Sequence, residues 1–326
     1  MDIPEELKDS INRLLSENKF SNIIEDAQTI SNRYRKNDGK GKRLLTNEAE
    51  AVSYAISRMP ATYAAVYSAF KQILANYNEK ITSLLDVGAG TGAGTWAVNE
   101  IESISQITCL EREKSMSNIG KKLMENTVLD NVQWKSYDIL QDEIAEKADI
   151  VLTSYMINEL PEQERENAVL KLWQATDKLM VVIEPGTPEG FKNILNIRNL
   201  IKEQGGYIVA PCCCNGECPI KENDWCAFYV RVARSSIHRQ AKCGNLGYED
   251  EKFSYIAVSK ISVEITGERI LRHPQINSGF VKVKLCTADG IQEKTYSKKD
   301  GEIYKKIKKL DAGEKIYWEN SKIVIL

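Results

Sequence analysis

Cysteine is the residue type whose placement in this 326-residue chain most directly indicates chemistry. Seven of the eight cysteines follow Pro211, and three of them have the spacing Cys212-x5-Cys218-x7-Cys226. Prolines and glycines interrupt the same stretch, which is typical of a loop. Thiolates in such a loop are typical ligands of zinc or of an iron-sulfur cluster. The sequence therefore predicts a metal site in this segment.

The compartment decides whether these thiols stay reduced. Residues Met1–Glu6 have neither the basic nor the apolar region of a secretory signal, and they are too acidic for a transit peptide. We therefore expect a cytoplasmic protein, in which clustered cysteines bind metal rather than form disulfides. The sequence has no run of eighteen apolar residues, so we expect no membrane partner.

A glycine-rich turn is the second feature with a chemical interpretation. It reads LLDVGAGTGAG from Leu84, and it places Gly88, Gly90 and Gly92 between a predicted strand and a predicted helix. Glycines let the backbone turn tightly and approach a ligand, and the helix that follows offers free N–H groups. NAD sites use a similar turn, so the turn alone does not select the cofactor.

Three carboxylates favour S-adenosylmethionine (SAM) over a dinucleotide. Asp86 precedes the first glycine, where it can meet the cationic methionine portion or its water shell. Glu111 ends the second predicted strand, where it can accept both ribose hydroxyls, and Asp138 follows the third, where it can accept from the adenine amino group. The alternatives are that Glu111 is a surface acid, with Glu113 as its rival, and that Asp138 caps a helix.

The end of the fourth predicted strand carries no recognisable catalytic motif for methyl transfer. Residues 153–161 lack the Asn/Asp-Pro-Pro-Tyr/Phe motif of nucleic-acid methyltransferases that act on exocyclic amines. Cys109 lies inside a predicted strand, so we expect it in the core. Tyr155 and Asn158 are the candidates to orient an acceptor, and the alternative is that they line a wall or cap a helix. The sequence leaves methyl transfer open.

The elements that position these residues follow from the hydrophobic pattern. Residues 1–78 are predicted to be a helical region in which Pro60 kinks one helix or begins another. From 79 to 207, short apolar strands alternate with amphipathic helices, which predicts a parallel sheet in a SAM-binding domain. Strands are expected at 83–87, 106–110, 132–136, 150–154 and 179–184, with helices at 114–125 and 162–175.

The chain beyond residue 207 departs from this alternation. We expect a Cys-rich metal-cluster module at 208–253 and a β-rich unit at 254–326, for which an OB-like arrangement is one option. Strands are expected at 254–258, 280–286 and 291–296, and Ala288-Asp289-Gly290 predicts a turn. The predicted fold class is α/β: a Rossmann-like class I methyltransferase sheet with a helical N-terminal extension, the Cys-rich module and a small C-terminal β unit.

Charge gives a weak indication of a nucleic-acid partner. The net charge is -2, but residues 260–326 contain 14 Lys+Arg against 9 Asp+Glu. A solvated face explains this surplus as well as RNA binding does. Basic side chains also gather around the cysteine segment, together with aromatic ones that can stack on bases. The basic residues are Arg231, Arg234, Arg239, Lys242 and Lys252, and the aromatic ones are Trp225, Phe228 and Tyr229.

Several of these segments together resemble the Rsm22 family of small-ribosomal-subunit-associated, methyltransferase-like proteins, which includes a mitochondrial type. The resemblance covers most of the chain from about Tyr34. It rests on Tyr54–Tyr63, the Asp86 loop, Asn158–Pro161, Glu184–Gly186, Ile208–Ala233 and Gly247–Tyr255. It implies SAM binding, a [4Fe-4S] cluster, and attachment to small-subunit ribosomal RNA (rRNA) during assembly or translation.

The resemblance also implies a set of cluster ligands. Three of them match Cys212, Cys218 and Cys226, and the fourth matches Cys286 in the context Leu-Cys-Thr-x-x-Gly. The chain departs from the family pattern by having additional cysteines, so a zinc site stays open as an alternative. The additional cysteines are Cys213, Cys214 and Cys243, the zinc set is Cys214, Cys218, Cys226 and Cys243, and His238 is a further conceivable ligand.

Two other functions stay open beside a SAM-dependent rRNA methyltransferase. One is a non-enzymatic ribosome-assembly factor, in which cofactor and cluster stabilise an RNA-binding shape. The other is a zinc-containing methyltransferase with a small-molecule substrate, which predicts no affinity for ribosomal particles. The sequence does not determine the oligomeric state, and we expect a monomer.

Overall fold

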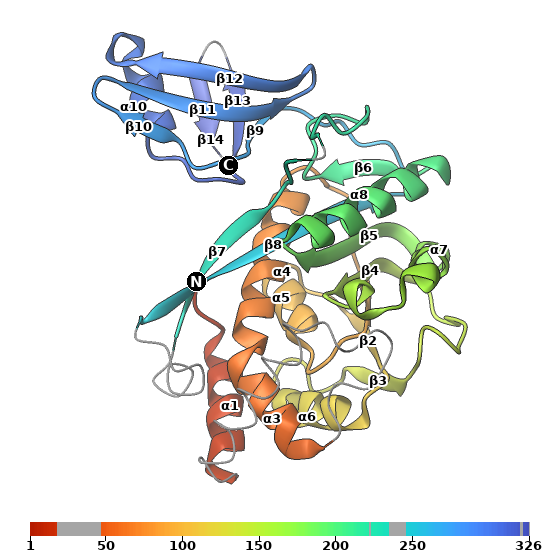
Figure 1. Cartoon of the computed structure of the whole chain (residues 1–326). Helices are drawn as coiled ribbons and strands as arrows, with labels where there is room; N and C mark the ends of the chain where they lie inside the picture. Colours follow the sequence, from red (N-terminus) through yellow and green to blue (C-terminus); the bar gives the residue numbers. More distant parts are fainter. Residues whose placement is uncertain (18–46, 222, 235–245, 320–321, 326) are drawn as a thin grey trace.

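The computed structural model describes residues 1–17, 47–221, 223–234, 246–319 and 322–325 (Figure 1). Within them, an eight-stranded sheet has the order β3-β2-β1-β4-β5-β8-β6, with β7 paired to β8. Strands β1 to β5 are parallel, and β8 is antiparallel to both of its neighbours in that order. The strands are β1 Ser83–Val87, β2 Gln106–Glu111, β3 Gln133–Ser136, β4 Ala148–Ser154, β5 Thr176–Pro185, β6 Tyr207–Ala210, β7 Phe228–Ala233 and β8 Tyr248–Ser259. This is the predicted Rossmann-like class I methyltransferase sheet.

Helices cover both faces of the large sheet (Figure 1). One face packs against α1 Glu5–Glu17, α3 Glu48–Ser57, α4 Met59–Leu74, α5 Ala93–Ile101 and α6 Lys114–Met124. The other packs against α7 Arg165–Ala175 and α8 Pro188–Glu203. Successive strand residues point to opposite faces, so Leu84 joins the first core and Leu85 the second. Among the described residues, no helix is both long and apolar enough to cross a membrane.

The predictions for the parallel strands, and for helices within residues 1–17 and 47–78, are confirmed, whereas residues 18–46 of the predicted helical region lie outside the described residues. Each strand expected between 83 and 184 is present, and β1 has the predicted bounds. Pro60 begins a helix, since it occupies the first turn of α4 just after α3 ends. Asn47 caps α3 by accepting a hydrogen bond from the backbone N–H of Glu50 at 2.8 Å.

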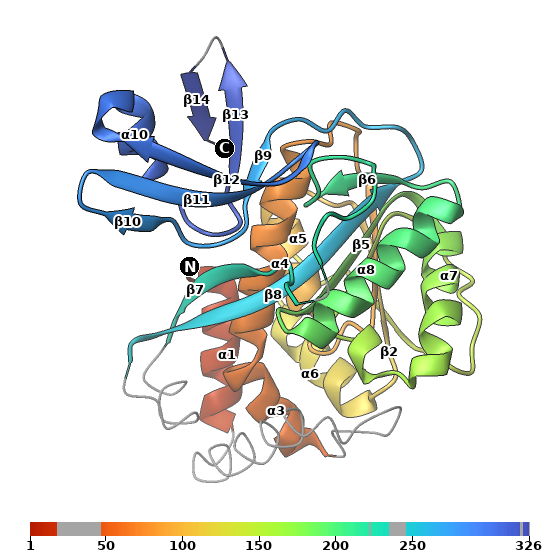
Figure 2. The ribbon, with the colours of Figure 1, turned by 45° about the horizontal axis from the view of Figure 1, so that its top comes forward.

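A second, antiparallel sheet forms the C-terminal unit. Within the described residues it has six strands in the order β10-β11-β9-β13-β14, with β12 paired to β11. The predicted turn joins β11 to β12. The C-terminal unit lies beside β6, β7 and one end of α4 (Figures 1 and 2). Its elements are β9 Glu268–Ile270, β10 Gln275–Asn277, β11 Phe280–Thr287, β12 Gly290–Ser297, α10 Glu302–Ile307, β13 Lys315–Glu319 and β14 Lys322–Ile325.

One strand lies in a different sheet from the predicted one. The sequence predicts Ser254–Val258 in the C-terminal unit, whereas these residues belong to β8, which lies between β5 and β6 in the large sheet. Strand β7, from the predicted Cys-rich module, pairs with β8 in the same sheet. An antiparallel strand added to a parallel sheet breaks the βα alternation, so the local residue pattern does not indicate to which sheet this strand belongs. The cysteines between residues 211 and 227 therefore lie in a loop that connects two strands of the large sheet.

Candidate functional site

The first candidate site is the edge at which the parallel strands end, where the glycine-rich turn connects β1 to α5. Gly88, Gly90 and Gly92 have φ values of 71°, 59° and 85°. Residues with a Cβ rarely adopt this left-handed region. A Cβ at Gly92 would also clash with the side chain of Met124. The turn therefore requires glycine, and it leads directly to the N-terminus of α5.

Glu111 lies against this turn at the end of β2. One carboxylate oxygen accepts a hydrogen bond from the backbone N–H of Gly90 and the other from that of Glu113, each at 2.7 Å. Glu111 is only 8% exposed, so the alternative of a surface acid is wrong. Burial raises the pKa of Glu111. Each carboxylate oxygen keeps a second lone pair, so both can still accept a ribose hydroxyl.

Asp86 is fully buried in β1. One carboxylate oxygen accepts from the Thr95 hydroxyl at 2.9 Å, and the other has no hydrogen-bond partner among the described residues. Burial raises the pKa of Asp86 to about 7. Cys109 is also fully buried, as expected for a core residue, with its sulfur 3.2 Å from the Thr95 hydroxyl. An unpartnered buried oxygen costs free energy, and a cationic donor would supply the missing hydrogen bond.

Asp138 follows β3 and makes local contacts. Its carboxylate accepts from the backbone N–H of Leu140 at 3.0 Å, and its other oxygen lies 3.9 Å from the Arg112 guanidinium. The first contact stabilises a turn at residues 139–141, and among the described residues no helix follows Asp138 before β4, so the alternative of a helix cap is wrong. The adenine contact of Asp138 stays a prediction.

Tyr155 directly follows β4 and has a φ of 62°, which is a rare conformation for a bulky residue. Its hydroxyl donates to the Glu251 carboxylate at 2.9 Å, and that carboxylate pairs with Arg58 at 3.2 Å. The network joins the α3–α4 junction, the end of β4 and β8. Strained backbone persists where surrounding contacts fix it, and such strain concentrates at functional sites. Sequence reasoning missed Arg58 and Glu251, although both lie in segments that carry the family resemblance.

Asn158 lies beside a buried carboxylate in the short helix η1 Ile157–Glu159. Its backbone N–H donates to Glu184 at 3.3 Å, and Glu184 also accepts from the Asn193 amide at 3.1 Å. Burial raises the pKa of Glu184 to about 7. Burial, with Glu111 and Glu184 nearby, raises the pKa of Glu159 to about 8. This edge of the sheet therefore gathers several carboxylates with raised pKa values, an environment that favours a cationic ligand.

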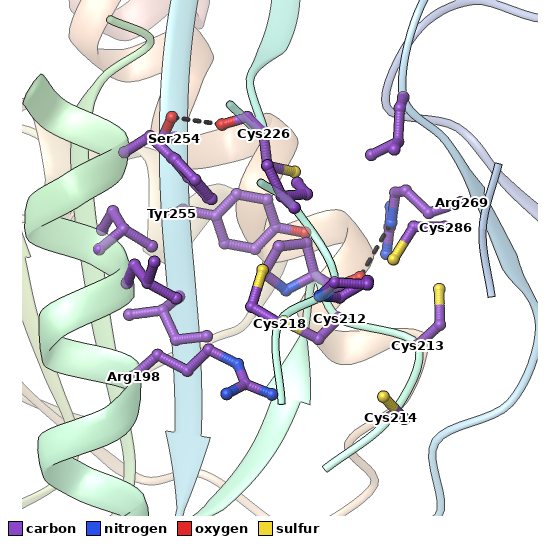
Figure 3. A pocket seen from close by; sticks show the side chains of 18 of the residues that line it. Arg198, Cys212, Cys213, Cys214, Cys218, Cys226, Ser254, Tyr255, Arg269 and Cys286 are labelled. Atoms are coloured by element: carbon purple, nitrogen blue, oxygen red, sulfur yellow. Dashed lines mark hydrogen bonds between the residues drawn. The ribbon is translucent and has the colours of Figure 1, made fainter. Parts of the chain in front are cut away.

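The second candidate site is a pocket lined by six cysteines (Figure 3). Five come from the loop between β6 and β7, and Cys286 comes from β11 of the C-terminal unit. The pocket contains about 610 Å³ of space between atoms, part of it open to solvent. The five loop cysteines are Cys212, Cys213, Cys214, Cys218 and Cys226.

The described cysteines form no disulfide bonds with one another. Within the described part of the chain, no three His, Cys, Asp or Glu side chains are arranged so as to hold a metal ion. The proximity of Cys213 and Cys286 lowers the pKa of Cys213 to about 7 and raises that of Cys286. Burial raises the pKa values of Cys212 and Cys226. His238 and Cys243 lie outside the described residues.

The basic cluster beside the cysteine loop is partly neutralised. Arg231 pairs with Asp250, and Arg234 pairs with Glu249, both through short carboxylate contacts of 2.7 and 2.8 Å. Arg239 and Lys242 lie outside the described residues. These pairs reduce the charge that the cluster offers to phosphates.

Lys252, another member of this cluster, lies beside two aromatic rings. Its ammonium lies 4.7 Å from the centre of the Trp225 ring and 5.2 Å from that of the exposed Tyr229. The prediction that Phe228 stacks on a base is wrong, because that ring is 2% exposed and packs against Phe253 in the core.

Comparisons with known proteins agree with the resemblance. The family model described as mitochondrial small ribosomal subunit Rsm22 matches residues 48–317. The human protein described as ribosome assembly protein METTL17, mitochondrial, is 27% identical over 320 residues, which cover 88% of this chain and 67% of the relative.

Solved structures with some likeness include methyltransferases. A putative RNA methyltransferase from Pyrococcus horikoshii is 14% identical, with a TM-score of 0.39 and coverage of 65% of this chain and 83% of that chain. Magnesium protoporphyrin IX methyltransferase from Synechocystis PCC 6803, with bound SAM, is 11% identical, with a TM-score of 0.41 and coverage of 71% and 90%. Because the family model spans most of the chain, from α3 into β13, this chain belongs to the Rsm22 family of the mitochondrial small ribosomal subunit.

Proposed function

We propose that this protein binds SAM and an iron-sulfur cluster and acts in the assembly of the small ribosomal subunit by binding its rRNA. One observation carries the proposal: the cysteines that the family resemblance implies as ligands line a single pocket, although one of them comes from a different sheet. These are Cys212, Cys218, Cys226 and Cys286. The description of the human relative as a ribosome assembly protein supports the role in assembly.

The chemistry of the pocket fits a cluster. Thiolates are soft ligands that select iron-sulfur clusters or zinc over hard cations, and four thiolates complete a [4Fe-4S] site. Ligation requires Cys286 to lose its proton, and the neighbouring Cys213 raises the pKa of this thiol. Because Cys286 lies on β11, its ligation ties the C-terminal unit to the loop of the large sheet, and cluster binding contributes to folding.

The edge of the large sheet fits SAM. The unpartnered oxygen of Asp86 accepts a hydrogen bond from the cationic amine of the ligand or its water shell, and Glu111 accepts from the ribose hydroxyls. Asp138 accepts from the adenine amino group. Bound SAM supplies an electrophilic methyl group, and the residues of this chain hold and orient it.

The contacts of Tyr155 favour a binding role over methyl transfer. Its hydroxyl already donates a hydrogen bond to Glu251, and that carboxylate forms an ion pair with Arg58. Methyl transfer to rRNA, with Tyr155 or Asn158 orienting the acceptor, is the second candidate function. Turnover of labelled SAM on small subunits, with loss in an Asp86→Ala variant, would establish the enzyme; cofactor binding without turnover would establish the assembly role.

The proposed RNA surface combines a cation with aromatic rings. Lys252 lies between Trp225 and Tyr229, so it can contact a phosphate while a ring stacks on a base. The C-terminal unit adds further cations near α10, which contribute to binding through counterion release. They are Lys305, Lys306, Lys308 and Lys309.

Metal analysis of anaerobically purified protein tests the cluster. We expect a brown protein with broad visible absorption and about four irons per chain. A Cys286→Ser variant should lose the iron, whereas Cys109→Ser, which changes a cysteine outside the pocket, should keep it. Colourless protein with about one zinc would contradict the cluster and favour the zinc-containing methyltransferase.

A further inference from the structure

Two buried arginines border the cysteine pocket. Arg198 comes from α8 and is 3% exposed, and Arg269 comes from β9 and is 2% exposed. Figure 3 shows Arg198 on the side of α8 and Arg269 beside Cys286 of the C-terminal unit. Buried arginines are rare unless an opposite charge pairs with them, so their position beside six thiols needs an explanation.

The hydrogen bonds of Arg198 leave one donor unused. Its guanidinium donates to the carbonyl oxygen of Gly216 and to the side-chain oxygen of Asn199. Its buried Nε–H has no partner among the described residues.

Arg269 has the same shortage of acceptors. Its Nε–H donates to the carbonyl oxygen of Pro211 at 3.0 Å, and Nη1 donates to Gly313 at 2.7 Å and to the side-chain oxygen of Gln72. Its buried Nη2 has no partner among the described residues. Each arginine therefore has a free N–H group in a residue that is almost entirely buried.

Neither charge is balanced by a carboxylate in the described structure. The oxygen acceptors of both guanidinium groups are backbone carbonyls or side-chain amides. The ammonium of Lys315, also buried, adds a third cation near Arg269, and it too bonds to an amide oxygen, that of Asn76. Burying positive charge without a carboxylate partner costs free energy, so these cations favour an anion in the pocket.

We propose that Arg198 and Arg269 hold the thiolate-ligated cluster, donating their free N–H groups to its sulfur atoms and balancing its negative charge. This inference rests on the proposed function, which supplies the anion. The arginines are positioning residues, because neither is a ligand of the metal. Hydrogen bonds to sulfur and nearby positive charge stabilise the more negative, reduced form of a cluster, and therefore raise its reduction potential.

The test measures the reduction potential of the cluster in wild-type protein and in Arg198→Gln, Arg269→Gln and Arg269→Lys variants, each with its iron and sulfide content. We expect the two glutamine variants to raise the ratio of oxidised to reduced cluster about tenfold at a fixed potential. This change corresponds to a reduction potential that is lower by about 59 mV for a one-electron couple. Arg269→Lys should shift the ratio less, because it keeps the charge. Arg165→Gln, which changes an arginine outside the pocket, should leave the ratio unchanged.

The outcomes separate this inference from the proposed function. Iron-free wild-type protein would overturn both. A wild-type cluster whose potential is the same in both glutamine variants would overturn the role of the arginines and leave the cluster intact. If Arg269→Gln fails to load while Arg269→Lys loads, the charge is needed to hold the cluster, which supports the inference. Loss of loading in both Arg269 variants, with no shift in Arg198→Gln, would show that Arg269 serves only the bonds to Pro211 and Gly313.

Discussion

Replacing Asp86 with Asn should make the stability of the protein less dependent on pH. Burial raises the pKa of Asp86 from its ordinary value of 3.8 to about 7 in the folded state. An acid whose folded-state pKa is raised contributes stability that is complete below the unfolded pKa and is lost as pH rises through the folded pKa. Wild-type protein therefore loses this contribution as pH rises to 7, whereas the amide that replaces the carboxylate in the variant does not ionise.

The magnitude follows from the range over which this carboxylate titrates. Between pH 5 and pH 7 the unfolded chain is ionised at this residue and the folded protein is not. Roughly two pH units at about 1.4 kcal/mol each give about 3 kcal/mol. The unfolding free energy of Asp86→Asn, relative to that of wild-type protein, should increase by this amount from pH 5 to pH 8, and it should level off above pH 7.

Urea unfolding of both proteins at each pH, under anaerobic conditions and without SAM, measures this difference. Glu111, Glu159 and Glu184 are present in both proteins, so their titration largely cancels. Adding SAM at pH 8 should stabilise wild-type protein more than the variant, since the ligand's cationic amine pairs with the ionised Asp86. A difference that stays constant between pH 5 and pH 8 would refute the buried, raised-pKa state of Asp86.

Three further predictions concern the turn, the network and the RNA surface. Gly92→Ala should lower the unfolding free energy by about 1–2 kcal/mol through its left-handed backbone, and it should weaken SAM binding because it adds a side chain to the turn that the cofactor approaches. Gly205→Ala, with a similar φ but outside the turn, should cost about 1–2 kcal/mol as well and leave SAM binding unchanged; equal losses of SAM affinity in the two variants would contradict the role of the turn. Tyr155→Phe removes a hydrogen bond to a carboxylate and should cost about 1.5–3 kcal/mol in urea unfolding; an unchanged midpoint would show that the bond contributes nothing. Lys252→Ala should weaken rRNA binding and lower the slope of log affinity against log salt by about 1, whereas Lys8→Ala, on α1, should not; an unchanged slope would remove Lys252 from the RNA surface.

The parallel part of the large sheet could be predicted because its signals are local. Each strand is a short apolar run, and the glycine turn follows β1 within a few residues, so the positions of Asp86 and Glu111 at one edge follow from βα alternation. Strand β8 could not be assigned in this way. Strand β8 pairs with β5 and β6, which are distant in sequence, and the residue pattern of β8 does not indicate these partners.

The contacts within the candidate sites could not be predicted as well from the sequence. The network of Arg58, Tyr155 and Glu251 joins three distant segments, and nothing local indicates which acid pairs with which base. The buried arginines are similar. Arg198 falls in an amphipathic helix, where a charged residue is ordinarily assigned to the solvent face, and its burial depends on how α8 packs against the cysteine loop.

The location of Cys286 shows what a family resemblance adds. Composition and spacing identify the loop cysteines, but only the resemblance implies Cys286 as a further ligand. Cys286 does line the same pocket as the loop cysteines. The proximity of Cys213 to Cys286 was not predicted, because Cys213 stands outside the family pattern.

The most direct test of a cluster-dependent role on the small ribosomal subunit is co-sedimentation of anaerobically purified, iron-loaded protein with isolated small subunits through a sucrose gradient. Wild-type protein and Cys109→Ser should migrate with the subunits, and Cys286→Ser should stay at the top of the gradient. Iron-loaded wild-type protein that remains at the top, or a Cys286→Ser variant that migrates with the subunits as well as wild-type protein does, would contradict that role.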